Sequence, residues 1–292
     1  MKTMKKLAAL LLALSLALAL AACSSQNTPS SAAPSQGTEE SSAPSEANEP
    51  AQGSGEYATV EDGKLIMATN CHFPPYEMVA DGAGVHQGYE GIDIEIAKAL
   101  ADALGLELVI DDMEFTSALL AVQENRADMI LAGLTYKPDR DEVMDFSTSY
   151  ATGVQVVIVP EGSDIETPDD LADGKLIGTQ RGTTGYIYCS DTPENGGYGE
   201  ENVLAYDNGA LAVQALLNGQ IDAVVIDNGP AQEYVAANPG LVILDTEYVT
   251  EDYCLAVNEG NAQLLDVLNT ILETMIDNGL IDEIVSHYIS AE

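Results

Sequence analysis

Segments with the apolar pattern of β-strands alternate with segments of helical periodicity from residue 57 to the end of the chain. The run at 64–69 (KLIMAT) has the length and composition of a buried strand, and residues 93–105 carry apolar side chains at helical spacing. Asp93 is predicted to be the N-cap of that helix and Gly105 its C-terminal stop. Repeated alternation of this kind predicts an α/β fold class with mostly parallel sheets.

The number of predicted strands is larger than one ordinary sheet holds. We therefore expect two lobes of sheet with flanking helices, joined by two crossing segments near 149–155 and 246–253. Lobe 1 then comprises 57–150 plus 250–292, and lobe 2 comprises 151–249. Beyond the two segments above, strands are expected at 106–110, 127–132, 155–159, 176–179, 203–206 and 221–226, and helices at 116–125, 209–218, 230–237, 261–278 and 281–289.

Polar loops rich in Gly and Pro follow four of the predicted strands. Ligands of open α/β sheets bind beyond the carboxyl ends of the strands, so these loops are candidate ligand contacts. Together they supply an Arg, an Asp, an Asn, three Thr, Gly amides and an aromatic side chain. The four loops are 70–77 (NCHFPPYE), 133–140 (GLTYKPDR), 180–185 (QRGTTG) and 227–230 (DNGP).

The N-terminus has the organisation of a secretory signal peptide. Three lysines precede a run of fourteen Leu, Ala and Ser residues at 7–20, which is shorter than the roughly 20 residues of a membrane-spanning helix. We predict a signal peptide at 1–22. The sequence Leu-Ala-Ala-Cys ending at Cys23 resembles a bacterial lipobox, and this resemblance implies cleavage before Cys23 and lipid attachment to its thiol. The alternative is an ordinary signal peptide whose cleavage site lies near a cysteine.

The segment that follows the signal peptide has no large apolar side chain. Residues 24–56 contain no Val, Ile, Leu, Met, Phe, Tyr or Trp, so residues 23–56 are predicted to be a disordered tether behind the lipidated Cys23. The whole chain carries 10 Lys and Arg against 48 Asp and Glu, a formal net charge of −38. A nucleic-acid-binding protein needs a basic surface, which these residues do not supply.

Six segments occur in the order and at the spacing of a known family: ATNCHFPPYE, GYEGIDIEIAKALADALG, MEFTSALLAVQENRADMILAGLTYKPDR, DFSTSYATGVQVVIV, IGTQRGTTG and LLNGQIDAVVIDNGPA. Residues 64–289 thereby resemble bacterial extracellular solute-binding proteins of the polar-amino-acid type. The resemblance implies a type II periplasmic-binding-protein fold whose two lobes close on a free polar amino acid. It also implies a monomer, anchored by lipid to the outer side of the cell membrane, that delivers its ligand to an ABC permease with a separate ATPase. No cofactor is expected.

Within this resemblance, Arg140 matches the residue that binds the ligand α-carboxylate, and Asp227 matches the residue that binds the α-ammonium. A planar guanidinium suits a carboxylate because it donates two parallel hydrogen bonds. The alternative for Arg140 is a surface ion pair with a neighbouring acidic residue. For Asp227 the other role is an N-cap of the helix that follows, and the two roles are compatible.

The remaining candidate contacts concern the ligand side chain and the loops around it. Phe73 and Phe115 match two positions that sandwich the ligand side chain, whereas Asn70 and Gln180 match positions that tune specificity. The segment from Ala132 to Thr135 resembles glutamine-binding members of the family, which favours a neutral polar side chain. The full set of expected contacts is Asn70, Phe73, Phe115, Ala132, Gly133, Thr135, Arg140, Gln180, Thr183, Thr184 and Asp227.

Two other functions are open to a chain of this pattern. An enzyme with dehydratase chemistry in the same cleft would need an acid–base group, for which His72 and Glu77 are the nearby candidates. A receptor subunit that reports to a kinase or channel is the second alternative. No metal site is expected, because Cys71 and His72 are adjacent and no second pair has ligand spacing. Without Cys23, three thiols remain, and pairing of Cys189 with Cys254 is left open.

Overall fold

The computed structural model describes residues 57–289. The predictions for the signal peptide, for lipidation of Cys23 and for the tether lie outside the described residues. Within them, no helix is both long and apolar enough to cross a membrane.

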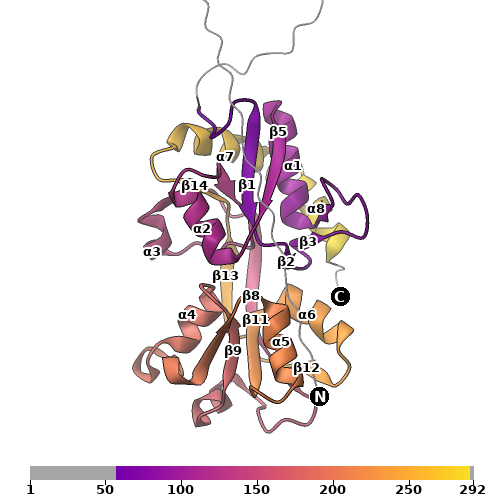
Figure 1. The fold of residues 1–292 in the computed structure, drawn as a ribbon, viewed down its shortest axis with the longest axis vertical. Helices are drawn as coiled ribbons and strands as arrows, with labels where there is room; N and C mark the ends of the chain where they lie inside the picture. The colour runs from indigo at the N-terminus through magenta and orange to yellow at the C-terminus, as the bar shows by residue number, and fades with distance from the viewer. Residues whose placement is uncertain (1–56, 290–292) are drawn as a thin grey trace, which may run out of the picture. The chain divides into compact units, whose positions relative to one another are not determined.

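Lobe 1 contains a five-stranded sheet with helices on both faces (Figure 1). Alternate residues of β1 face opposite sides, so Leu65 and Met67 pack under α1, α7 and α8, whereas Ile66 and Ala68 pack under α2. The strand order is β5-β1-β6-β14-β7, with bounds β1 Lys64–Thr69, β5 Glu107–Asp112, β6 Met129–Ile130, β7 Met144–Phe146 and β14 Ala256–Asn258. The helices are α1 Ile92–Leu104, α2 Phe115–Gln123, α3 Pro138–Asp141, α7 Ala262–Asp277 and α8 Leu280–Tyr288. A small antiparallel sheet joins β2 His72–Phe73, β3 Glu77–Val79 and β4 Tyr89–Glu90.

Lobe 2 repeats this arrangement around a second sheet, of order β10-β9-β11-β8-β12 with β13 also paired to β8. Helices α5 and α6 pack on one face, and α4 packs with the 3₁₀ segment η1 on the other. The strands are β8 Ala151–Pro160, β9 Ile177–Gln180, β10 Val203–Tyr206, β11 Ala223–Asp227, β12 Leu241–Ile243 and β13 Val249–Tyr253. The helices are α4 Thr184–Ser190, α5 Gly209–Leu217 and α6 Asn228–Ala237, with 3₁₀ turns η1 Pro168–Asp173, η2 Pro193–Asn195 and η3 Glu200–Asn202.

Two strands connect the lobes. β8 and β13 pair antiparallel, with Ala151 opposite Tyr253 and Gln155 opposite Val249, and they run between the two lobes in Figure 1. The expected crossings at 149–155 and 246–253 overlap these two strands, but β13 pairs within the sheet of lobe 2, whereas residues from 250 on were expected in lobe 1.

The α/β fold class is confirmed, but the sheets are mixed rather than mostly parallel. β5, β1 and β6 are parallel, as are β10, β9 and β11, whereas every pair that includes β8 or β14 is antiparallel. The reason is the connection between lobes, because a chain that crosses to the other lobe and back enters each sheet from the opposite end.

Some local predictions need correction. Gly91, not Asp93, occupies the N-cap position of α1, and Asp93 is fully buried inside the helix. The loop expected at 180–185 ends at residue 183, because 184–190 form α4, to which no element had been assigned beyond residue 185, and the strand expected at 127–132 is confined to 129–130. The three cysteines in the described part of the chain, Cys71, Cys189 and Cys254, are free and buried, so the 189–254 disulfide does not form.

Candidate functional site

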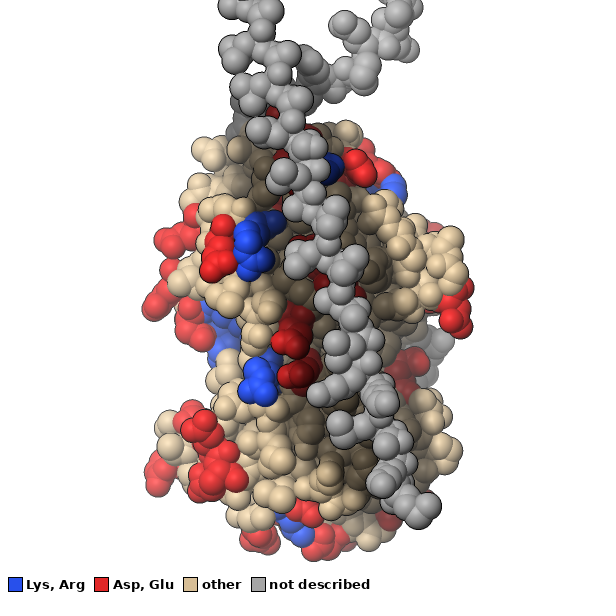
Figure 2. All heavy atoms as spheres, viewed as in Figure 1, with Lys and Arg blue, Asp and Glu red and all other residues tan. Residues whose placement is uncertain are grey.

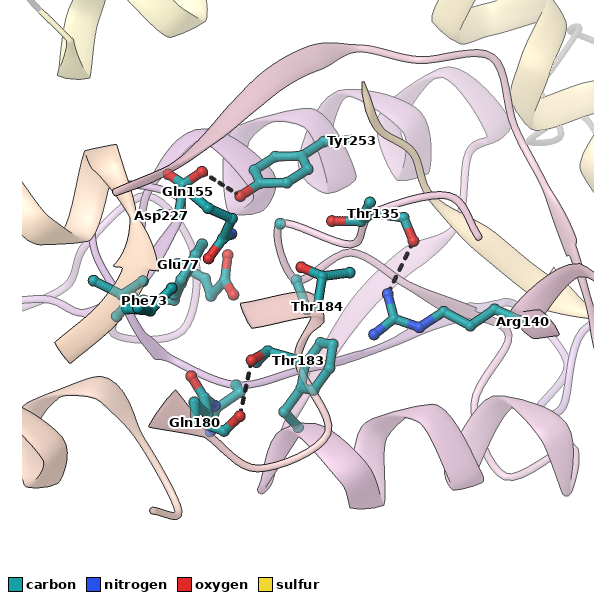
Figure 3. Close-up of a pocket in the computed structure, with 16 residues that line it drawn as sticks. Phe73, Glu77, Thr135, Arg140, Gln155, Gln180, Thr183, Thr184, Asp227 and Tyr253 are labelled. Carbon is teal, nitrogen blue, oxygen red and sulfur yellow. Dashed lines mark hydrogen bonds between the residues drawn. The ribbon is translucent and has the colours of Figure 1, made fainter. Parts of the chain in front are cut away.

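A cavity lies between the lobes and is lined by residues of both (Figure 3). All eleven residues expected to contact a ligand line it, because each lobe presents the carboxyl ends of its parallel strands to the other. The lining comprises Asn70, Phe73, Glu77, Phe115, Ala132, Gly133, Thr135, Arg140, Gln155, Gln180, Thr183, Thr184, Val225, Ile226, Asp227 and Tyr253.

Arg140 is the cation of the cavity. It belongs to the short helix α3, and its guanidinium donates hydrogen bonds from Nη1 to the carbonyl of Thr135 (2.9 Å) and from Nη2 to the carbonyl of Gly182 in lobe 2 (3.0 Å). Two of its five N–H donors are thereby used, and three remain. The Arg140 Cζ atom also lies 5.6 Å from the ring centroid of Phe115.

The electrostatic position of Arg140 differs from that of every other described cation. Six of the seven Lys and Arg side chains in residues 57–289 lie within 4.0 Å of a carboxylate oxygen, and Arg140 is the seventh. Burial lowers its pKa, while the charges of Asp139 and Glu251 act in the opposite direction. A surface ion pair, the alternative considered for Arg140, is therefore not what this buried side chain forms.

Asp227 is the acidic counterpart on lobe 2. It ends β11 and caps α6, with Oδ1 accepting from the amide of Gly229 at 3.0 Å. Its Oδ2 accepts from the amide of Val154 at 2.9 Å and from the Tyr253 hydroxyl at 2.6 Å. Burial raises the pKa of Asp227 to about 6, and these hydrogen bonds keep it from rising further. The side chain thus caps a helix and also lines the cavity, on the side opposite Arg140 (Figure 3).

The two predicted phenylalanines form part of the wall. Phe73 stacks on Tyr76 with the ring centroids 5.7 Å apart, and Phe115 begins α2. The approach of Phe73 requires a glycine at 133, because a Cβ there would lie 2.6 Å from Cε1 of the Phe73 ring. Gly133 also has a φ of +50°, and its amide donates to Oδ2 of Asp93 at 2.8 Å.

Asn70 and Gln180 bind each other across the lobes. The Gln180 Nε2 atom donates to Oδ1 of Asn70 at 3.0 Å, and the Asn70 amide donates to the carbonyl of Met113 at 2.8 Å. The hydroxyls of the two predicted threonines are also engaged, since Thr183 donates to the carbonyl of Gln180 and Thr184 donates to Glu251. The single proton of each hydroxyl is thereby used, so these hydroxyls could contact a ligand only as acceptors unless the bonds rearrange.

The chain matches the model of the bacterial extracellular solute-binding proteins, family 3, over residues 65–291. The chain belongs to this family. A probable histidine-binding protein of Neisseria gonorrhoeae is 30% identical over 292 residues, covering 99% of this chain and 97% of the relative. The arginine-binding extracellular protein ArtP of Bacillus subtilis is also 30% identical, over 78% of this chain and 87% of its own.

Solved structures agree with this assignment. An ancestral arginine-binding protein bound to glutamine superposes with a TM-score of 0.71 at 34% identity, covering 79% of this chain and all of its own. The relatives are named as binding proteins and not as enzymes, which confirms the prediction of a binding protein rather than a cleft enzyme.

Five lining residues of this solute-binding protein were not among the predicted contacts: Glu77, Gln155, Val225, Ile226 and Tyr253. Glu77 was considered only as an acid–base group, although its place after Pro-Pro-Tyr in the first loop pointed to the cavity. Gln155 and Tyr253 lie on the crossing strands, whose role as a cavity wall appears only once β8 and β13 are paired.

Glu77 is the most unusual of these residues. It is 1% exposed, and neither carboxyl oxygen has a hydrogen-bond donor among the described groups. Burial and then the neighbouring Asp93 carboxylate raise the pKa of Glu77 well above its ordinary value. Asp93 accepts hydrogen bonds from the Gly133 amide and the Tyr150 hydroxyl, and burial raises its pKa to about 6. The cavity wall therefore includes one buried carboxyl group without a hydrogen-bond partner in the described part of the chain, that of Glu77, and Asp93 lies beside it outside the cavity lining.

Proposed function

We propose that this solute-binding protein is the substrate-binding lipoprotein of an ABC importer and captures a polar α-amino acid between its lobes. The observation that carries the proposal is that Arg140 and Asp227 face one cavity from different lobes. An α-amino acid bears a carboxylate and an ammonium on one carbon, so it can bind both residues at once. Relatives named for histidine, arginine, glutamine and cystine support this ligand class.

Closure of the lobes follows from the same geometry. A ligand that contacts both walls binds the closed arrangement better than an open one, and it shifts the population by that difference in affinity. β8 and β13 are the natural place for the bend, because they are the strands that pass between the lobes. The closed, loaded protein is then the form that a membrane permease with its ATPase would recognise.

Glu77 favours a cationic ligand side chain over the neutral one expected from the segment Ala132–Thr135. Once the α-carboxylate binds Arg140 and the α-ammonium binds Asp227, the Glu77 carboxyl group, beside Asp93, is left without a partner among the described residues. A guanidinium, ammonium or imidazolium group would supply the missing donors and charge. Because burial raises the pKa of Glu77, a cation that binds the ionised form would expel a proton.

Titration calorimetry against the twenty L-amino acids tests this function. We expect a polar amino acid to bind with a Kd of about 1 µM or tighter, near −8 kcal/mol, and L-arginine to bind more tightly than L-glutamine. Agmatine, which lacks the carboxylate of arginine, and Nα-acetyl-arginine, which lacks the ammonium, should each bind at least about a hundredfold more weakly. Binding of none of the twenty amino acids would refute the proposal.

The Glu77→Gln variant tests whether Glu77 selects a cationic ligand side chain, independently of how the ligand's α-carboxylate and α-ammonium bind. It should weaken binding of L-arginine and leave binding of L-glutamine within a few-fold, and proton release measured in buffers of different ionisation enthalpy should disappear. Tighter binding of L-glutamine than of L-arginine by the unchanged protein would show that the cavity selects a neutral amide.

Anchoring at Cys23 is part of the same proposal and has its own test. The Cys23→Ser variant should release soluble precursor or mature protein, and radiolabelled palmitate should no longer be incorporated. Persistent label on that variant would refute lipidation at this residue.

A further inference from the structure

A contact between the lobes lies outside the ligand cavity. The Lys137 ammonium nitrogen, in lobe 1, is 5.0 Å from the centroid of the Tyr188 ring, which belongs to α4 in lobe 2. The Lys137 side chain is only 17% exposed, although the nearest carboxylate oxygen, on Asp139, is 3.9 Å away. Cation–π attraction is stronger at sites with little solvent, so this pair holds the two lobes together at one side of the cleft.

Tyr188 is fixed on its other side by Glu251 of the crossing strand β13. Its hydroxyl donates to Oε1 of Glu251 at 3.0 Å, and Oε2 of Glu251 accepts from Gln155 Nε2 at 3.0 Å and from the Thr184 hydroxyl at 2.9 Å. Glu251 is 5% exposed, and it thereby ties β13, β8 and α4 together. Burial and the Glu251 charge raise the pKa of Tyr188 to about 12, so the phenol stays protonated and remains the donor.

We propose that Lys137, Tyr188 and Glu251 form a latch that stabilises the closed cleft from outside the cavity and sets how long the bound solute stays. None of the three lines the cavity, so they act on affinity through the closed population and not through contact with the solute. Glu251 on β13 holds the hydroxyl of Tyr188, and the ring of Tyr188, which belongs to lobe 2, contacts Lys137 of lobe 1. The predicted effect on solute release rests on the proposed function, whereas the predicted effect on closure of the lobes does not.

The latch is tested by a double-mutant cycle of Lys137→Met and Tyr188→Leu with L-arginine as the probe. Each single variant should raise the dissociation rate about three- to tenfold, as expected for one cation–π contact of low exposure, and leave the association rate within twofold. The double variant should release L-arginine no faster than the faster-releasing of the two single variants, because both changes remove the same contact. Tyr188→Phe keeps the ring and loses the bond to Glu251, so it should have an intermediate effect.

Lys175→Met is the matched control. Lys175 has a side chain 21% exposed and pairs with Asp164 within lobe 2, with 2.7 Å between nitrogen and oxygen, so it makes no contact across the cleft. This variant should change the dissociation rate by less than twofold. Asp139→Asn removes the long ion pair of Lys137 and leaves the cation–π contact in place. It too should change the dissociation rate by less than twofold.

A second readout does not depend on any solute. In the Cys23→Ser protein, fluorophores attached at Glu142→Cys in lobe 1 and Glu194→Cys in lobe 2 report the distance between lobes. Burial raises the pKa of the three remaining native thiols, Cys71, Cys189 and Cys254, and keeps them unreactive. Single-molecule energy transfer without amino acid should show a smaller closed fraction for Lys137→Met than for Lys175→Met. Equal closed fractions, or additive effects in the cycle, would overturn the latch. A protein that binds no amino acid would refute the proposed function while this distance measurement still decides the latch.

Discussion

The Tyr253 hydroxyl lies 2.6 Å from Oδ2 of Asp227, and the two residues come from the crossing strand β13 and the end of β11. This bond connects the ribbon that joins the lobes with the carboxylate that faces Arg140 across the cavity. Because Val154 of the other crossing strand donates to the same oxygen, both connecting strands fix one acidic group. Any bend of the ribbon therefore changes the surroundings of Asp227, and bending and ligand binding are coupled at this residue. Acidic side chains are scattered in groups over the face seen in Figure 2, but Asp227 differs from them in being buried.

The Arg140→Ala variant should lose most of the affinity for L-arginine or L-glutamine. Removal of one partner from a buried charged pair costs roughly 2–5 kcal/mol, which corresponds to about thirtyfold to several thousandfold in Kd. Arg140→Lys should restore only part of this loss, because an ammonium cannot make the planar double contact. Calorimetry measures the loss, and affinity within threefold of the unchanged protein would contradict the role assigned to Arg140.

Binding of L-glutamine should weaken at acid pH through Asp227. Its pKa of about 6 without ligand means that most of the side chain is neutral at pH 5, and a neutral carboxyl group binds an ammonium poorly. Affinity should fall about tenfold between pH 7 and pH 5 by linkage. In Tyr253→Phe the pKa of Asp227 should rise, because the lost hydroxyl bonds the charged form, so the fall should begin at higher pH. A pH profile unchanged in Tyr253→Phe would show that this bond does not control the ammonium site.

Stability of the ligand-free protein should change with pH in the opposite direction. Burial raises the folded-state pKa of Asp93 and of Asp227 to about 6, above the unfolded value of about 3.9. Between pH 4 and pH 6 the folded state therefore binds more protons, and its free energy of unfolding rises as pH falls from 7 to 5, by about 1–3 kcal/mol. Urea denaturation measures this change, and Asp227→Asn should have a shallower slope. The same slope in that variant would assign the effect to general charge repulsion.

Gly182 offers a test of how closely the lobes must approach. Its φ is +75°, and a Cβ there would lie 2.6 Å from the Cγ2 methyl of Thr116 in the other lobe. Gly174 has a φ of +76° with open space around it, so Gly174→Ala carries the same backbone strain, about 1–2 kcal/mol, without the clash. Gly182→Ala should lose a similar amount of stability and, in addition, affinity for L-arginine, whereas Gly174→Ala should keep its affinity.

Thr116→Ser provides the rescue for that variant, because it removes the methyl group that the new Cβ would meet. In combination with Gly182→Ala it should recover most of the lost affinity, measured by calorimetry. If Gly182→Ala and Gly174→Ala bind equally well, the approach at this point is not needed for closure.

Local sequence patterns determined the α/β class, the position of β1 and β10, the end of α1 at Gly105 and the strand-end loops that supply Arg140 and Asp227. These features depend on the periodicity of apolar residues and on turn chemistry within about ten residues, so the sequence alone carries them. The tertiary structure decided the features that join distant segments. Asp93 is of a residue type that often caps helices, but it is buried and accepts hydrogen bonds from Gly133 and Tyr150, which are 40 and 57 residues away.

The same is true of the latch and of the mixed sheets. Lys137, Tyr188 and Glu251 are separated by 51 and 63 residues, and no local pattern distinguishes them from exposed polar residues. Their meeting depends on how β8 and β13 pair and on how the two lobes are set against each other. Burial raises the pKa of Glu77 and Asp227 and lowers that of Arg140, and it is likewise a property of the tertiary structure, because it depends on which distant segments cover the side chain.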